Sequence, residues 1–442
     1  MEMIRHAWPK VWQRHTALTF YLALMAVLLL GVYIEAGPSY LPVNLHYLFL
    51  LLFAYAVASV TLREPFGQLA QWAQRNDRLQ AYKPLLARLI DAVVLVFPFL
   101  YFASAGYVPF VRMMFMDDYY AASGLRQAFF DVLPAWANYG GEYFLRALAP
   151  VWLVYSFIHR RRVFFPALLI TSAQALGVIT KTSIVILLFP LLVVQLHRRA
   201  WAHAVLTSGI IVTVLILNVT VLHNSALTQM AKTEAQKVLE AKEKKRMIAE
   251  HKAFEENPSA VTRFLEQHLD SGDSERAVIE EYKALELASE GIWIRLFAVQ
   301  GRIVKQWLDT YPTERGFQHG CGYRWFAPLV PCAFENLPRS VWNKYFPELR
   351  EVYHLTGTVS APHYINAYAN FGDMGVLLAA IGMAAMLVAL AGLFPNPVHN
   401  LAFNASFLAL ALQAPLFSLL NSSGWALTIL LYLVFFPREA KR

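Results

Sequence analysis

The sequence is poor in charged residues and very poor in cysteine. Only 15% of its 442 residues are charged, whereas 57% are hydrophobic. A soluble protein of this length does not need so much apolar sequence. Windows of about 18 or more apolar residues recur along the chain, which is the signal of transmembrane helices. The sequence therefore predicts an all-α polytopic membrane protein.

Several further features are missing. The sequence has no His/Cys cluster with zinc spacing and no calcium-binding loop, so we expect neither a metal nor another cofactor. It has no internal repeat and no low-complexity tract. Its two cysteines, Cys321 and Cys332, lie eleven residues apart in a polar segment. The sequence leaves open whether they form a disulfide in an oxidising compartment or remain free thiols.

Positive charge is distributed unevenly along the chain. The polar segment 224–360 contains 18 Lys and Arg against 19 Asp and Glu, whereas the remainder contains 20 against 11. Most of the excess bases lie in short loops between apolar runs, such as the loop 63–87 and the Arg160-Arg161-Arg162 run. This pattern places those loops in the cytoplasm, and it does not suggest binding to nucleic acid.

Ten apolar runs are candidate membrane spans. They cover about 16–34, 44–62, 88–107, 141–158, 163–179, 183–197, 204–223, 363–393, 400–419 and 423–437. With the basic loops inside, both termini are cytoplasmic and the polar segment emerges on the outer side. We predict a bundle of about seven helices over 1–223, a mainly helical outer cap over 224–360, and about three further spans over 361–442.

The stretch Gly291–Trp325, inside the polar segment, is a candidate for anion binding. Its first half is predicted to be an amphipathic helix in which Arg295 and Arg302, two helical turns apart, leave from one face. A Gly-rich turn region with Arg315 and Arg324 follows. Guanidinium groups pair bidentately with phosphate oxygens, so this pattern suits a phosphate-bearing ligand. The plain alternative is a solvated charged face on a surface helix.

A second informative stretch opens the eighth predicted span. His363, Asn366, Asn370 and Asp373 are spaced by three, four and three residues, which places them on one helix face. Polar groups are costly in a bilayer, so such a stripe usually faces a cavity or the bundle interior. The helix dipole disfavours a protonated imidazole at the N-terminal end of a helix. His363 is therefore expected to be neutral, as a general base must be. The alternative is a structural stripe bonded to neighbouring helices.

Lys181 lies at the tip of the hairpin between the runs 163–179 and 183–197. The two runs are separated by only three residues, and their tip is predicted to face outside. A lone lysine at a membrane interface is usually an anchor. Its place on the outer side, against the bias of the other bases, favours contact with an anionic headgroup.

Together these features resemble the O-antigen polymerase and ligase superfamily of membrane glycosyltransferases, in particular the Wzy-like polymerases. Those proteins are similar in having a tight hairpin with a basic residue, a large periplasmic loop with arginines, and a polar motif that opens the next helix. The matching segments are Ile179–Ser183, the helix with Arg295 and Arg302, Gly320–Gly322, and Tyr368–Gly375.

Two features depart from the family pattern. The hairpin base is usually arginine, and here it is Lys181. In the ligase branch the histidine is usually followed directly by asparagine, whereas Tyr364 and Ile365 intervene after His363 here. The second departure argues against the ligase branch.

The resemblance implies polymerisation of undecaprenyl-pyrophosphate-linked oligosaccharide repeat units into surface polysaccharide, without a metal. It implies a multi-pass protein of the bacterial inner membrane with its large domain in the periplasm. Expected partners are the lipid-linked oligosaccharide, membrane lipids, a chain-length regulator and a flippase. The implied catalytic residues are His363, Arg295 and Arg302, and the implied substrate-binding residues are Lys181, Arg315, Arg324, Asn366, Asn370 and Asp373.

Four alternatives remain open. One is an O-antigen ligase that transfers the glycan to lipid A-core. Another is a polyprenyl-phosphate-dependent enzyme that uses acidic residues of an outer loop, for which Asp117-Asp118 is the only similar pair. A polyprenyl-linked sugar transporter would favour inverted repeats, and none is visible. A sensor or scaffold with an outer helical domain is the fourth.

Overall fold

The computed structural model describes most of the chain. The described residues are 2–115, 125, 128–227, 299–324, 326–351 and 357–436. Every regular element within these ranges is a helix, and five helices are apolar and long enough to cross a membrane. The fold is that of an all-α membrane protein. The first part of the outer cap, Arg295 and Asp117-Asp118 lie outside the described residues, so the statements about them stay predictions.

The five long apolar helices coincide with predicted spans. They are Arg14–Glu35, Pro38–Thr61, Gln80–Ala105, Trp201–Asn218 and His363–Leu393. Three other predicted spans correspond to shorter apolar helices, Arg162–Gly177, Thr182–His197 and Trp425–Phe435. At 1.5 Å per residue, a helix of about 17 residues is roughly 25 Å long, a little less than the hydrocarbon core. The total of ten spans stays a prediction.

The remaining two predicted spans are interrupted helices. The run 141–158 is built from α7 (Ala135–Tyr143), a π-helical turn (Phe144–Leu148) and α8 (Ala149–His159). The run 400–419 divides into α19 (Pro397–Leu410) and α20 (Leu416–Leu420). The interruptions lie beside Pro150 and Pro415, and proline removes a helical hydrogen bond and crowds the preceding turn.

The chain forms two compact units whose boundaries differ from the predicted division. The bundle unit comprises Met1–Tyr21, Leu52–Met230 and Ile381–Arg442, and the cap unit comprises Leu22–Leu51 and Ala231–Ala380. The boundaries fall inside three long helices, α1 (Glu2–Glu35), α2 (Leu41–Thr61) and α18 (His363–Leu393). The cap unit therefore includes apolar helical segments as well as the polar insert.

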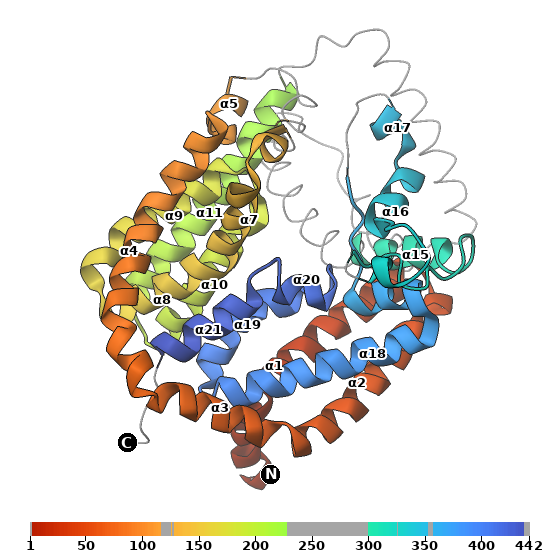
Figure 1. Ribbon diagram of the computed structural model, residues 1–442, viewed down its shortest axis with the longest axis horizontal. Helices are drawn as coiled ribbons and strands as arrows, with labels where there is room; N and C mark the ends of the chain where they lie inside the picture. The colour runs from red at the N-terminus through yellow and green to blue at the C-terminus, as the bar shows by residue number, and fades with distance from the viewer. Residues whose placement is uncertain are drawn as a thin grey trace, which may run out of the picture. The chain divides into compact units, whose positions relative to one another are not determined.

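The bundle unit contains the helices from the end of the second predicted span through the seventh, together with the C-terminal helices. Figure 1 shows several of them side by side. Besides those already named, they are α3 (Arg63–Arg75), α4 (Asp77–Ala105), α5 (Pro109–Met113), α9 (Arg161–Gly177), α10 (Lys181–His197), α11 (Trp201–Leu227) and α21 (Trp425–Phe435). The predicted loop 63–87 is thus largely helical. The α9–α10 hairpin is as tight as predicted, since only residues 178–180 connect the helices.

A buried polar contact ties three helices of the bundle unit together. The indole N–H of Trp152 on α8 donates to Asp91 on α4 at 3.0 Å. The other carboxylate oxygen of Asp91 lies 2.9 Å from the guanidinium of Arg160, at the start of α9. A carboxylate among apolar helices is costly unless it is paired, and here both of its oxygens have a donor.

From residue 299 onward, the described part of the polar segment 224–360 belongs to the cap unit and consists of short helices and turns. They include α15 (Val299–Thr310), α16 (Leu337–Tyr345) and α17 (Pro347–Glu351). Figure 1 shows α15 and α16 close to the start of α18. The predicted amphipathic helix is confirmed over α15, which buries Gly301, Val304 and Trp307 at intervals of three residues.

α15 lies directly against the backbone of α1. A Cβ atom added to Gly301 would stand 2.1 Å from the carbonyl oxygen of Gly31 and 3.0 Å from the amide nitrogen of Val32. Only glycine permits so close an approach of two helix backbones. The Trp307 indole N–H then donates to the carbonyl of Val359 at 2.9 Å, which connects α15 to the segment before α18.

Candidate functional site

The candidate site begins at the first residue of α18. Pro362 precedes the helix, and its carbonyl accepts the amide hydrogens of Ile365 and Asn366. His363 is buried, with 2% of its surface exposed. A hydrogen bond of 3.0 Å joins its Nε2 atom to the hydroxyl of Tyr47 on α2. The two rings meet edge to face at 5.3 Å between centroids, so Tyr47 fixes the plane of the imidazole.

A second set of contacts holds Tyr47 in place. Its ring stacks on that of Tyr364, with centroids 4.0 Å apart and an interplanar angle of 8°. The hydroxyl of Tyr364 donates to the side-chain oxygen of Asn44 at 2.6 Å, and the Asn44 amide donates to the carbonyl of Tyr40 at 2.7 Å. Because this network is buried and paired, the position of His363 is determined by the opening turns of two helices.

Asn366 and Asn370 continue the polar face of α18, and both are buried. The Asn370 amide donates to the carbonyl of Asn366 at 2.9 Å, and its oxygen accepts the backbone N–H of Gly322 at 3.0 Å. The backbone N–H of Gln318 also donates to the carbonyl of Ala369 at 3.0 Å. Asn370 therefore ties the Gly-rich loop of the polar segment to α18. This contact corresponds to the alternative in which the predicted polar stripe has a structural role.

The prediction that Asp373 shares this face is wrong. Gly372 has φ 61° and ψ −143°, so the helix is broken one residue before Asp373. The Asp373 side chain is 79% exposed and lies 3.6 Å from the His46 imidazole. Counting intervals of three and four residues assumes an unbroken helix, and a glycine with positive φ removes that condition.

The loop that contacts α18 is itself braced by a disulfide and by one carboxylate. Cys321 and Cys332 are bonded, which answers the question that their spacing left open. Glu335 donates its backbone N–H to the carbonyl of Cys321 at 2.9 Å. Its carboxylate accepts from Tyr311 at 3.3 Å, from Arg315 at 2.8 Å and from Ser340 at 2.7 Å.

The environment of Glu335 also affects the acidity of Tyr311. Burial, followed by the negative charge of Glu335, raises the pKa of Tyr311 to about 12. Burial alone raises the pKa of Tyr323 in the same loop. Both phenols therefore stay protonated at neutral pH and do not serve as bases there, and the Tyr311 hydroxyl donates to Glu335.

The predicted phosphate-binding arginines differ in what they contact. Arg302 lies 3.4 Å from the carboxylate of Glu35 on α1, and Arg315 lies 2.8 Å from Glu335. Arg324 is exposed, with its guanidinium 5.8 Å from the centroid of the Phe334 ring. Within the described part of the chain, no acid lies within ion-pair distance of Arg324. Arg324 is thus the described arginine of the loop whose charge is least compensated.

Arg324 also lies close to the polar face of α18. It follows Gly322 by two residues, and two residues of extended backbone span at most about 7 Å. Gly322 is hydrogen-bonded to Asn370, so the Arg324 backbone begins within that distance of the Asn370 contact. The structure thus gathers a buried imidazole, two buried asparagines and an uncompensated guanidinium on neighbouring segments of one unit.

Two other predicted site residues, Lys181 and Arg295, lie outside the described part of the cap unit. Lys181 is the first residue of α10 and belongs to the bundle unit. Arg295 lies outside the described residues, so the predicted pair of aligned arginines with Arg302 stays a prediction.

Sequence reasoning missed the residues that position the site. Asn44 and Tyr47 lie at the start of an apolar run, and a buried asparagine in such a run is a signal that could have been used. Glu35 and Glu335, which neutralise two of the predicted cations, carry no motif. Their pairing depends on residues that are far apart in sequence.

We compared the chain with known proteins at the level of family, sequence and fold. No protein-family model, no curated protein and no solved structure matches the chain. The function of the protein is therefore inferred from the chemistry of the site itself.

Proposed function

We propose that this protein is an integral-membrane glycosyltransferase that polymerises undecaprenyl-pyrophosphate-linked oligosaccharide repeat units into a bacterial surface polysaccharide. The observation that carries the proposal is His363, a buried imidazole held by Tyr47 at the start of an apolar helix, beside a basic loop. A lipid-linked substrate presents its pyrophosphate near the end of a membrane helix, so a proton acceptor and an anion-binding group at that end support the proposal.

The reaction joins two lipid-linked glycans. The hydroxyl oxygen of the acceptor sugar attacks the anomeric carbon of the donor glycan, and the bond from that carbon to the pyrophosphate oxygen breaks. The departing undecaprenyl pyrophosphate takes the electron pair. His363 accepts the proton of the attacking hydroxyl, as general base. Tyr47 is a positioning residue, because it acts through the imidazole.

Negative charge grows on the pyrophosphate as the bond breaks, so the reaction needs a fixed cation there. Arg324 is suited to this task because its charge is not already neutralised by a described acid. Arg302 and Arg315 would first have to leave Glu35 and Glu335. Lys181 and Arg295 remain predicted contributors.

The disulfide supports the proposed location. Disulfides persist in oxidising compartments and are rare in the cytosol. A bonded Cys321–Cys332 pair in the insert therefore favours the bacterial periplasm for the cap, with the protein in the inner membrane. The basic loops of the bundle unit favour the same orientation.

The proposal is tested in a deletion strain that is complemented with the gene. We expect His363→Gln and Arg324→Ala to abolish or strongly shorten the polymer on a gel, at normal protein levels in the membrane. Arg350→Ala is the matched control, because Arg350 is an exposed arginine of the same unit on α17. Long chains with both site variants would refute the proposal.

Two further outcomes separate the alternatives. A product in which preassembled glycan is joined to lipid A-core, without chain growth, would establish a ligase instead. Loss of polymer growth on treatment of membranes with a chelator would favour a metal-dependent enzyme. We expect a chelator to have no effect, because the proposed reaction uses a guanidinium rather than a metal ion to stabilise the departing pyrophosphate.

A further inference from the structure

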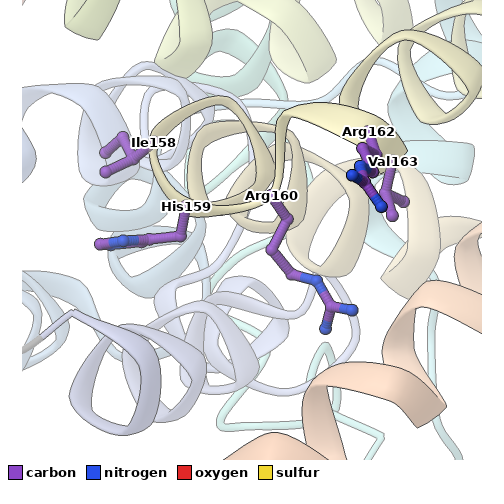
Figure 2. Close-up of a pocket in the computed structure, with 5 residues that line it drawn as sticks. All are labelled: Ile158, His159, Arg160, Arg162 and Val163. Carbon is purple, nitrogen blue, oxygen red and sulfur yellow. The ribbon is translucent and has the colours of Figure 1, made fainter.

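The bundle unit contains a second site candidate, at the turn between α8 and α9. A hollow of about 530 Å³ opens there, and Figure 2 shows the side chains around it. It is lined by Ile158, His159, Arg160, Arg162 and Val163. The lining thus combines two guanidinium groups and an imidazole with two apolar side chains. None of these residues belongs to the proposed glycosyltransferase site.

The two arginines of the hollow are in different states. Arg160 is half-buried and its guanidinium lies 2.9 Å from the Asp91 carboxylate. Arg162 is exposed, and within the described part of the bundle unit it has no acidic partner at ion-pair distance. Arg160 is therefore a fixed part of the wall, whereas Arg162 is available to an anion.

Further positive charge surrounds the turn. Lys83 on α4 and Arg198 after α10 both lie close enough to His159 for their positive charges to act on it. The Lys83 ammonium donates a hydrogen bond to the carbonyl of Phe435 at 3.1 Å. This bond holds the ammonium at the same end of the unit. Cations from three segments thus gather at the end where the sequence places the cytoplasmic loops.

An apolar strip leads away from Arg162 along α9. Phe165 and Leu169 follow Arg162 at intervals of three and four residues, which places all three on one helix face. Phe165 is 53% exposed and Leu169 is 72% exposed. The surface is therefore basic at the helix end and apolar along the helix, which matches the headgroup and acyl chain of a lipid.

We infer that this hollow and strip bind an anionic phospholipid, with its headgroup phosphate at Arg162 and one acyl chain along Phe165 and Leu169. The phosphate would accept hydrogen bonds from the Arg162 guanidinium. Val163, which Figure 2 shows beside Arg162, would contact the glycerol region. The occupant is a lipid rather than a free anion because the exposed apolar strip continues directly from the cation.

The test uses the full-length protein in detergent. Short-chain phosphatidylglycerol, short-chain phosphatidylcholine and inorganic phosphate are titrated separately, and bound molecules are counted by native mass spectrometry. We expect phosphatidylglycerol to bind more tightly than either of the other two. Arg162→Gln should lower the affinity for phosphatidylglycerol about tenfold, because it removes charge-assisted hydrogen bonds. Leu169→Ser should lower this affinity by a smaller factor.

Arg75→Gln is the matched control, since Arg75 is an exposed arginine at the end of α3 on the same predicted side of the membrane. It should bind phosphatidylglycerol as the parent protein does. Equal binding of phosphatidylglycerol by the parent and by Arg162→Gln would overturn the inference. Equal binding of phosphatidylcholine would overturn it as well, and equal binding of inorganic phosphate would replace the lipid site with a simple anion site.

Discussion

The contact between α15 and α1 allows one prediction to be worked out from atomic distances. A Cβ at Gly301 would stand 2.1 Å from the carbonyl oxygen of Gly31. Carbon and oxygen atoms in close contact are about 3.3 Å apart. Gly301→Ala must therefore separate the two helix backbones by about 1 Å, or unwind the start of α15. Neither backbone can turn aside as a flexible side chain can.

Two opposing effects set the size of the stability change caused by Gly301→Ala. Alanine is a better helix former than glycine by about 1 kcal/mol, which favours the variant. Overpacking a filled contact costs about 1–3 kcal/mol, and a clash between two backbones belongs at the upper end of that range. We expect a net loss of about 1–2 kcal/mol in the stability of the cap unit. Gly67→Ala is the matched control, because nothing lies within 4 Å of a Cβ at Gly67 on α3.

The assay is the apparent melting temperature of the purified protein in detergent, followed by tryptophan fluorescence. Trp307, which is fully buried on α15, is one of the eleven tryptophans that contribute to this signal. Gly301→Ala should lower the melting temperature by several degrees, whereas Gly67→Ala should leave it unchanged or raise it. If both variants shift it in the same direction and by the same amount, the close approach of α15 to α1 is not present in the protein.

Three further predictions follow from other contacts. Tyr47→Phe keeps the stack on Tyr364 but removes the hydrogen bond to His363, so the kcat of polymerisation should fall about tenfold with KM unchanged; a change in KM alone would argue against a positioning residue. Serine at both Cys321 and Cys332 removes a crosslink over eleven residues and should destabilise the cap by about 3 kcal/mol in thermal unfolding. Reductant should destabilise the parent protein but not that double variant, and an equal effect on both would contradict the prediction. Since its pKa is raised from 10.0 to about 12, Tyr311 contributes stability that is complete below pH 10 and declines as the pH rises to 12. Tyr311→Phe should flatten the loss of stability over that interval, and an unchanged slope would refute this assignment.

The existence of the helices could be predicted from the sequence, because long apolar runs such as those of α4 and α18 have few other stable structures in a membrane. The helix breaks could be predicted less well. Pro150 and Pro415 were visible inside predicted spans, but proline alone does not locate a break, since Pro98 in α4 and Pro190 in α10 lie inside continuous helices. The break at Gly372 depends on its backbone conformation, and the sequence offers no measure of φ.

The site was predictable in its residue types but not in its contacts. His363 and Asn370 were found because polar groups are unusual at the start of an apolar helix. Tyr47 was not, because its hydrogen bond to His363 joins residues 316 positions apart. The same limit applies to Arg302, whose ion pair with Glu35 reduces the charge that it can offer to a ligand.

The central claim is best tested with purified protein in liposomes that contain undecaprenyl-pyrophosphate-linked repeat units as the only substrate. The measurement is the amount of undecaprenyl pyrophosphate released per glycosidic linkage formed. The proposed reaction predicts one molecule released per linkage by the parent protein and by Arg350→Ala, and neither release nor chain growth with His363→Gln. Chain growth by His363→Gln at the parent rate, or no growth by the correctly folded parent protein, would contradict the account.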